Sequence, residues 1–155
     1  MTVHALTEYL EYKMPRLRLA LIKESDVKPT RIYTPDSVAE FLMPLRLYSE
    51  EYFIALHLSA INEVIGYHLV SHGTLNASLV HPREVFKACL LANSHAIIVA
   101  HNHPAGSLVA TDEDIKTTEQ LIAAGNILAV PVLDHIIVSI NGSMSIRENH
   151  KYLWD

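Results

Sequence analysis

The sequence predicts a layered α/β domain, in which helices pack on one mixed β-sheet. Short apolar runs alternate along the chain with segments of helical periodicity, which is the pattern of such folds. Half of the residues are hydrophobic and 19% are charged, as in a globular chain. A length of 155 residues suits one domain. We expect an N-terminal arm with a strand in residues 1–33 and a compact domain in residues 34–155.

The first elements are predicted from local signals. Residues 17–22 alternate partly between apolar and polar side chains, which indicates a strand. Thr34 is a suitable helix cap, and Pro35 suits the first turn of the helix that follows. Pro44 is expected to end or kink that helix.

A hairpin and a second helix are expected next. Residues 51–58 predict a strand, and residues 64–70 predict its antiparallel partner after a short turn. Residues 73–76 read as a loop. Pro82 then begins a helix that we expect to end near Asn93.

The last third of the chain predicts one more helix and further strands. A helix is expected to begin at Thr111 and to stop at Gly125. Residues 128–140 are apolar and β-branched, which indicates one or two buried strands with a break at the internal proline. Asn141–Gly142 is a two-residue hairpin signal leading into a strand over residues 143–147.

Two histidines follow a buried strand predicted over residues 96–100. His101 and His103 stand two positions apart, so on a strand both imidazoles project from the same face. Such a pair alone is weak evidence, because the ten histidines of this chain would give about 0.6 such pairs by chance. Pro104 breaks the strand directly afterwards.

A third ligand is available on the helix that begins at Thr111. Asp114 falls in its first turn, where its carboxylate can reach the same point as the two imidazoles. Two nitrogens and one oxygen form a three-ligand set that zinc accepts while keeping a fourth position for water, as catalytic sites do. Asp112 and Glu113 share that turn, and composition alone does not choose among the three acids.

Hydrolysis at such a site requires a base for the water molecule. A carboxylate within hydrogen-bond reach can take the proton and deliver it to a leaving amine. Spacing along the chain leaves three candidates open, namely Glu50, Glu51 and Glu63.

The motif resembles that of a known family. His101 to Gly106, followed by Thr111 and Asp114, is similar to the JAMM (MPN+) metallopeptidase motif. The flanking segments resemble the RadC branch of that family over about residues 34–147. The segments that carry this likeness are Gly73–Asn76, Val80–Lys87, Ala124–Gly125 and Leu133–Ile137.

This resemblance implies a three-layer αβα fold, similar in its layers to cytidine deaminases, and a zinc-dependent hydrolase of peptide or isopeptide bonds. It implies that His101, His103 and Asp114 hold one Zn²⁺ per chain. It also implies that Glu51 is the base, with Glu50 as the reserve candidate, and that the Thr111 hydroxyl stabilises the oxyanion. Of these residues, Glu51 and the three ligands match the family pattern as they stand in this sequence.

The sequence also departs from the family pattern. Thr111 stands where the family usually has serine, and its extra methyl group is expected to slow turnover without affecting the metal. Ala105 stands where serine is frequent, which we expect to be harmless. Full-length members carry a helix-hairpin-helix module, for which residues 1–33 are too short.

Other classes of function fit less well. A non-catalytic module that acts in DNA repair through partners is the alternative, although the net charge of −5 argues against direct duplex binding. A nucleobase deaminase would need a Pro-Cys-x-x-Cys run, which the lone Cys89 excludes. His-Asn-His is also the name of a nuclease motif, but its ββα context is missing here.

The remaining signals concern location and packing. The lone Cys89 suits a reducing cytoplasm, and neither a secretory signal nor a membrane-spanning run is expected. Cys89 is expected in the core, and His57 is expected to be packed or on the surface rather than in the cleft. His68, His72 and His135 are expected to be structural. The substrate and the oligomeric state stay open.

Overall fold

The computed structural model describes residues 26, 28, 30–73 and 80–155. The strand predicted over residues 17–22 lies outside this described part, as does most of the loop predicted over residues 73–76. The elements, in chain order, are β1 Thr30–Arg31, α2 Pro35–Phe41, the 3₁₀ helix η1 Met43–Leu47, β2 Glu51–Leu58, β3 Glu63–Gly73, α3 Pro82–Leu91, β4 Ala96–Asn102, α4 Asp112–Leu128, β5 Val132–Ser139, β6 Gly142–Ser145, α5 Ile146–Asn149 and the 3₁₀ helix η3 Lys151–Leu153.

These strands form one sheet in the order β1-β3-β2-β4-β5-β6. Strands β4 and β5 are parallel, and the other neighbouring pairs are antiparallel. The sheet is therefore mixed, as the sequence predicts. The crossover between β4 and β5 contains α4, which is the usual way of joining parallel neighbours.

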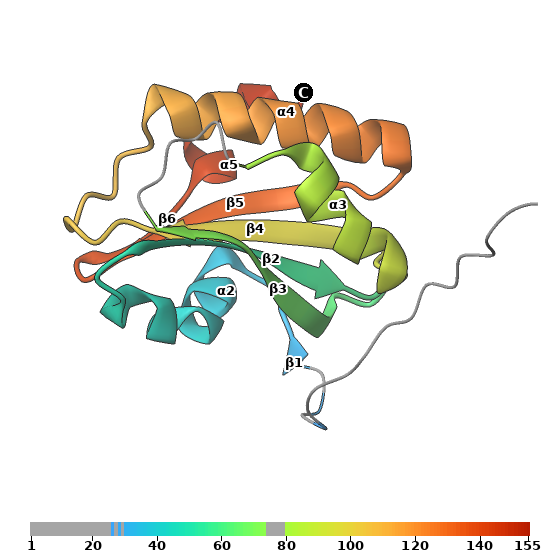
Figure 1. The fold of residues 1–155 in the computed structure, drawn as a ribbon, viewed down its shortest axis with the longest axis horizontal. Helices are drawn as coiled ribbons and strands as arrows, with labels where there is room; N and C mark the ends of the chain where they lie inside the picture. Colours follow the sequence, from blue (N-terminus) through green and yellow to red (C-terminus); the bar gives the residue numbers. More distant parts are fainter. Residues whose placement is uncertain (1–25, 27, 29, 74–79) are drawn as a thin grey trace, which may run out of the picture.

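Helices cover both faces of the sheet, which confirms the three-layer α/β class (Figure 1). One core lies under α3 and α4, where Phe86 and Leu121 pack on Val99 of β4. The other core lies under α2 and η1, where Val38 packs towards Ile98 and other side chains on the opposite face of β4. All seven residues of β4 are buried, because this strand runs between the two cores. Cys89 is buried in the first core, as predicted.

The predicted start of α2 is confirmed in detail. The Thr34 hydroxyl accepts a hydrogen bond from the Ser37 backbone N–H, and the Ser37 hydroxyl accepts one from Thr34 N–H. Pro35 occupies the first turn, where no backbone donor is needed. Beyond α2 the chain tightens into η1, which contains Pro44.

The end predicted for α4 is wrong. The helix continues past Gly125 to Leu128, and Ala129 adopts the left-handed conformation with φ +55° that ends it. Gly125 instead allows close packing. A Cβ atom there would lie 2.6 Å from the Val130 carbonyl oxygen and 3.2 Å from Phe86. Because the helix occupies the chain as far as Leu128, the strand that was expected to begin there begins only at Val132.

The end predicted for the last strand is also wrong. Strand β6 stops at Ser145, and the short helix α5 follows where residues 146 and 147 were expected to be extended. The Ser145 hydroxyl accepts a hydrogen bond from Glu148 N–H, so it caps this helix and turns the chain away from the sheet.

Among the helices of the described residues, none combines the length and the apolar character needed to cross a bilayer.

Gly125 within α4 and Ala129 directly after it are expected to have opposite effects on stability when substituted. Gly125→Ala should lower the free energy of unfolding by about 1–3 kcal/mol, because the added methyl group overlaps a backbone carbonyl. Ala129→Gly should raise it by about 1 kcal/mol, since glycine adopts φ +55° without strain. Urea unfolding of both variants checks this. Stabilisation by Gly125→Ala would contradict the packing role, because alanine is otherwise the better helix former.

Candidate metal centre

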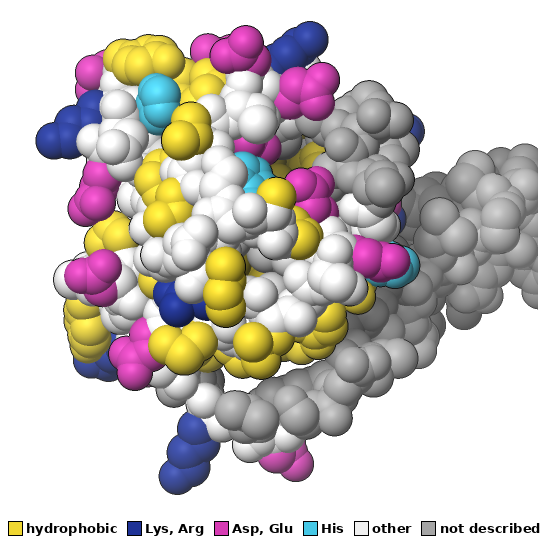
Figure 2. Space-filling model, turned by 90° about the vertical axis from the view of Figure 1, so that its left-hand side faces the viewer, with side chains coloured by type: hydrophobic (Ala, Val, Ile, Leu, Met, Phe, Trp, Pro, Cys, Tyr) yellow, Lys and Arg dark blue, Asp and Glu magenta, His cyan; other side chains and the backbone are white. Residues whose placement is uncertain are grey.

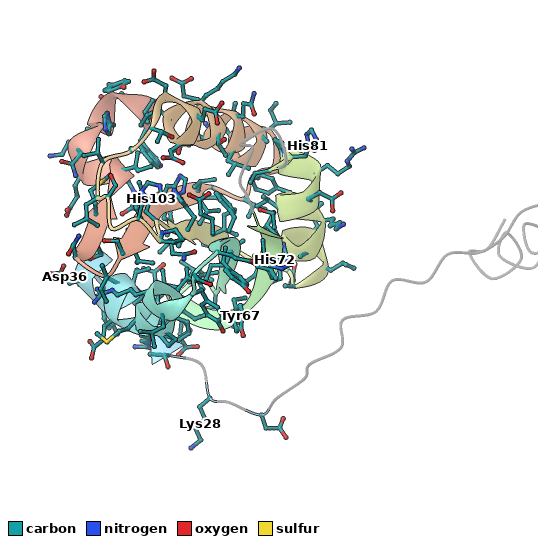
Figure 3. The ribbon with its side chains drawn as sticks, turned by 60° about the vertical axis from the view of Figure 1, so that its left-hand side comes forward. Lys28, Asp36, Tyr67, His72, His81 and His103 are labelled. Atoms are coloured by element: carbon teal, nitrogen blue, oxygen red, sulfur yellow. The ribbon has the colours of Figure 1, made fainter. Side chains whose placement is uncertain are left out.

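Strand β4 carries His101 to the end of the sheet, and His103 directly follows the last residue of the strand. His101 pairs with Phe53 of β2 on one side and with Ile137 of β5 on the other, so its position is set by two neighbouring strands. Its ring stacks on the ring of Phe53 at a centroid distance of 5.9 Å. His101 is 1% exposed and His103 is 9% exposed, so both imidazoles are largely removed from water. In Figure 3, His103 lies in the interior of the molecule beneath α4, whereas Lys28 points away from it.

The first turn of α4 brings Asp114 to the same point. The Thr111 hydroxyl accepts a hydrogen bond from Asp114 N–H, which forms a capping box. In return, Oδ2 of Asp114 accepts from the backbone N–H and from the hydroxyl of Thr111, both at 2.7 Å. These bonds hold the carboxylate over the sheet end. Asp112 and Glu113 of the same turn are exposed, so the structure separates the three acids that composition left equivalent.

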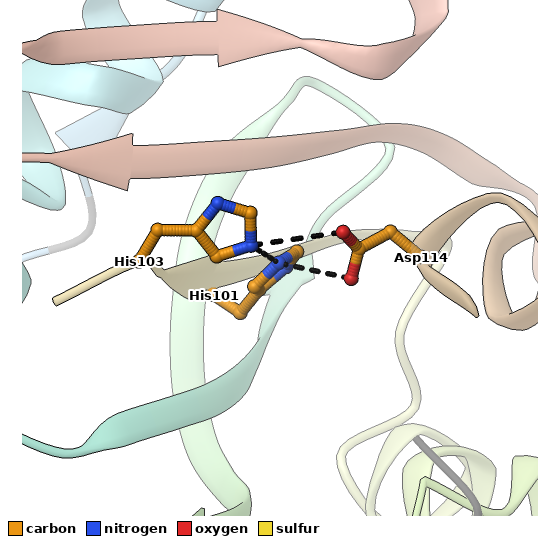
Figure 4. A group of neighbouring side chains, drawn as sticks. All are labelled: His101, His103 and Asp114. Carbon is orange, nitrogen blue, oxygen red and sulfur yellow. Dashed lines mark hydrogen bonds and ion pairs between the residues drawn. The ribbon is translucent and has the colours of Figure 1, made fainter. Parts of the chain in front are cut away.

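The three side chains converge closely (Figure 4). Nε2 of His101 lies 2.9 Å from Nε2 of His103. Oδ1 of Asp114 is 3.2 Å from the His101 Nε2 atom, and Oδ2 is 3.6 Å from that of His103. One ligand atom from each residue falls within 4.8 Å of the other two.

The protonation of His103 shows why this grouping fits a cation. Its Nδ1 atom lies 3.2 Å from the Ser107 carbonyl oxygen, which only accepts, so Nδ1 carries the hydrogen in the neutral ring. The Nε2 lone pair then faces the Asp114 carboxylate and His101. Acceptor atoms this close repel one another unless a proton or a metal ion lies among them. Two imidazole nitrogens and one carboxylate oxygen suit Zn²⁺.

The pKa values of the group follow from this crowding. A hydrogen bond to Asp114 raises the pKa of His103, although partial burial opposes the shift. Burial alone would raise the pKa of Asp114, but hydrogen bonds with His101 and His103 hold it well below its ordinary value. Both shifts favour the charged pair, in which one proton occupies the place that fits a metal.

The three candidate bases lie in different places. Continuing the antiparallel register of β2 and β4 by two residues beyond Phe53–His101 places Glu51 beside His103, on the same face of the sheet. Glu51 also contributes to the raised pKa of His103 through its charge. The Glu50 carboxylate lies 3.7 Å from His72, and Glu63 pairs with Arg31 at the far end of β3.

A cavity of about 130 Å³ opens onto the three converging side chains. Its walls are Glu51, Phe53, Val80, His101, His103, Thr111, Glu113, Asp114 and Thr117. A larger cavity of about 570 Å³, lined in part by Tyr33, Arg147 and Trp154, contains none of the predicted site residues. We place the candidate metal site in the smaller cavity, because metal binding depends on converging ligand atoms rather than on the volume of the cavity.

The other histidines divide into packed and exposed ones. His57 is buried at the opposite end of the same sheet face, where it bonds to the Ser94 hydroxyl and to His68. Burial lowers the pKa of His57 to about 4, as expected for a packed, neutral histidine. His72 is exposed beside Tyr52.

His135 lies against the site, which spacing along the chain did not indicate. It is fully buried on β5, and its Nε2 atom is 2.8 Å from Nδ1 of His101. Burial lowers its pKa well below the ordinary value. The sequence indicates that the strands bearing His101 and His135 are both buried. It does not specify the register in which they pair, so the contact between the two histidines could not be predicted.

Comparison with known proteins identifies the family of this chain. The family model of the RadC-like JAB domain matches residues 32–152. A UPF0758 protein of Finegoldia magna is 45% identical over 132 residues, which cover 84% of this chain and 58% of the relative. A UPF0758 protein of Desulfitobacterium hafniense is 38% identical over 159 residues, which cover 96% of this chain and 70% of the relative.

A third relative, from Symbiobacterium thermophilum, is 47% identical over 115 residues and is also named a UPF0758 protein. The match covers 74% of this chain and 49% of that relative, so the chain spans between 49% and 70% of the length of these three relatives. The matched segment contains the whole candidate site. The chain belongs to the family of RadC-like JAB domains.

Proposed function

We propose that this domain is a zinc-dependent hydrolase that cleaves a peptide or isopeptide bond. The observation that carries the proposal is the convergence of two imidazole nitrogens and one carboxylate oxygen in a cavity that Glu51 also lines. Membership of the JAB family supports a hydrolase. The relatives bear only UPF0758 names, so the activity and the substrate are our inference.

The metal would be held by the Nε2 atoms of His101 and His103 and by one carboxylate oxygen of Asp114. Oδ1 is the more available oxygen of Asp114, because Oδ2 already accepts two hydrogen bonds from Thr111. When bound, Zn²⁺ would polarise the substrate carbonyl and lower the pKa of a water molecule at the open position.

Glu51 is proposed as the general base and acid. It stands beside His103 at the head of β2, where its carboxylate can take a proton from the attacking water. The same carboxyl group can then return the proton to the leaving amine nitrogen. Glu50 and Glu63 are poorly placed for this role, since each carboxylate faces a different partner.

Thr111 is proposed to stabilise the oxyanion, which is the role that the likeness to the JAMM motif implies for the hydroxyl at this position. Its hydroxyl donates to Oδ2 of Asp114 in the structure, so contact with an oxyanion requires that the hydroxyl turn away. Asp114 would keep the bond from the Thr111 backbone N–H during this rotation. The extra methyl group of threonine restricts χ1, which would slow the rotation relative to serine.

Direct binding to duplex DNA does not form part of the proposal. The chain has a net charge of −5. In Figure 2, the described Lys and Arg side chains are scattered rather than gathered into a continuous patch on the face shown. Phosphate-backbone binding depends on clustered cationic side chains.

Metal content tests the ligand set. Protein purified without added zinc should contain about one zinc ion per chain, because three preformed ligands suffice for tight binding. His103→Ala and Asp114→Ala should lose the ion, whereas His72→Ala should keep it, since His72 is exposed beside Tyr52. Elemental analysis by mass spectrometry gives the stoichiometry. A parent protein without stoichiometric metal would sink the metal assignment.

Substitution of the proposed base, Glu51, should affect catalysis without affecting metal binding. Glu51→Gln should keep its zinc but lower kcat about 10²–10⁴-fold, because the amide cannot accept the proton. Quenched fluorescent peptide libraries and lysine ε-amide isopeptides are suitable probes. Glu50→Gln is the matched neighbour, one residue away, and should retain activity. If Glu50→Gln abolished hydrolysis and Glu51→Gln did not, the assignment would be reversed.

The raised pKa of His103 predicts how zinc affinity depends on pH. Protons and zinc compete for the same Nε2 lone pair, so affinity should be constant above the raised pKa and fall below it. Each pH unit below it should weaken binding about tenfold for each protonated histidine. Competition titrations with a chromophoric chelator between about pH 8 and pH 5.5 measure this. An affinity independent of pH over that range would contradict the ligand role of His103.

A further inference from the structure

His135 lies directly behind His101, on the side away from the cavity. Its side chain is fully buried on β5, and its Nε2 atom is 2.8 Å from Nδ1 of His101. The cavity walls do not include it. It therefore contacts a proposed ligand without reaching the place where a metal or a substrate would bind.

A hydrogen-bond chain continues from His135 to the other side of the site. Nδ1 of His135 lies 2.6 Å from the hydroxyl oxygen of Thr118 on α4. The Thr118 hydroxyl lies 2.6 Å from the backbone carbonyl oxygen of Asp114. The chain thus runs from the ring of His101 to the backbone of Asp114 and connects β4, β5 and α4.

The donor and acceptor of every hydrogen bond in this series follow from the group at its end, the backbone carbonyl of Asp114. A carbonyl oxygen only accepts, so the Thr118 hydroxyl must donate its hydrogen to Asp114. Its oxygen then accepts from Nδ1–H of His135. Full burial favours the neutral imidazole, which leaves a lone pair on Nε2 of His135. That lone pair accepts Nδ1–H of His101.

We propose that His135 and Thr118 are positioning residues that hold His101 as its Nδ1–H tautomer, with the Nε2 lone pair directed at the metal. The inference rests on the proposed metal site. Hydrogen bonds of this kind orient a ligating imidazole and raise its basicity, and their loss commonly weakens metal binding 10–100-fold. The ring of His103 is oriented differently, by the Ser107 carbonyl in the loop after β4.

Two pairs of variants of the intact protein test the hydrogen bonds made by His135 and Thr118. His135→Leu removes the acceptor for His101, and His135→Gln restores one through its amide oxygen. Thr118→Val removes the hydroxyl at nearly constant shape, and Thr118→Ser restores it. We expect His135→Leu to weaken zinc binding about 10–100-fold and Thr118→Val to weaken it by a smaller factor. Both restoring variants should stay within a few fold of the parent protein.

A matched control separates positioning from loss of stability. His57 is also buried, on the same face of the sheet, but it bonds to Ser94 and His68 far from the site. His57→Leu should therefore lower the melting temperature while leaving zinc affinity unchanged. Should His57→Leu weaken zinc binding as much as His135→Leu does, the effect would be one of general stability and the inference would fail.

A spectroscopic readout tests the tautomer directly. In ¹⁵N NMR spectra of the zinc-loaded protein, His101 should show a protonated Nδ1 and a metal-bound Nε2. Cobalt substitution should give a visible spectrum that changes in His135→Leu and returns in His135→Gln. Protonation of Nε2 on His101, or parent-like zinc affinity in both His135→Leu and Thr118→Val, would overturn the inference. A parent protein that binds no zinc would instead overturn the proposed function beneath it.

Discussion

The mutual repulsion of three acceptor groups is the constraint on which the rest of this structure depends. Lone pairs of His101 and His103 and the Asp114 carboxylate face one another within a few ångströms, in a place largely shielded from water. Such an arrangement is unfavourable unless positive charge lies among the groups. The fold must therefore hold these side chains against their tendency to separate, and a proton or a metal ion must complete them.

The scaffold meets this requirement with its most buried strand and a capped helix. Strand β4 lies between two hydrophobic cores, so the position of His101 cannot relax without disturbing both. The capping box of α4 fixes Asp114 with bonds that also start the helix. The same residues thus serve local stability and site geometry. This explains how Thr111 can be both a helix cap and a proposed catalytic group.

The start of strand β2 separates two of the candidate bases. Glu50 and Glu51 are adjacent in sequence, yet only Glu51 of the two lines the cavity, because Glu51 begins β2 whereas Glu50 precedes the strand and its carboxylate lies beside His72. A shift of one residue in the pairing of β2 with β4 would exchange them. The buried partners Phe53 and His101 oppose such a shift, since their rings stack across the two strands.

Local sequence determined the helix starts at Thr34 and Thr111, the strand that bears the histidine pair, and the layered α/β class, because caps and periodicity act over a few residues. The resemblance selected Glu51 where spacing had left three carboxylates open. Only the tertiary structure placed His135 behind His101, and only it showed that Gly125 allows close packing rather than ending a helix. Both depend on contacts between distant segments, whose register and close approach no local pattern specifies.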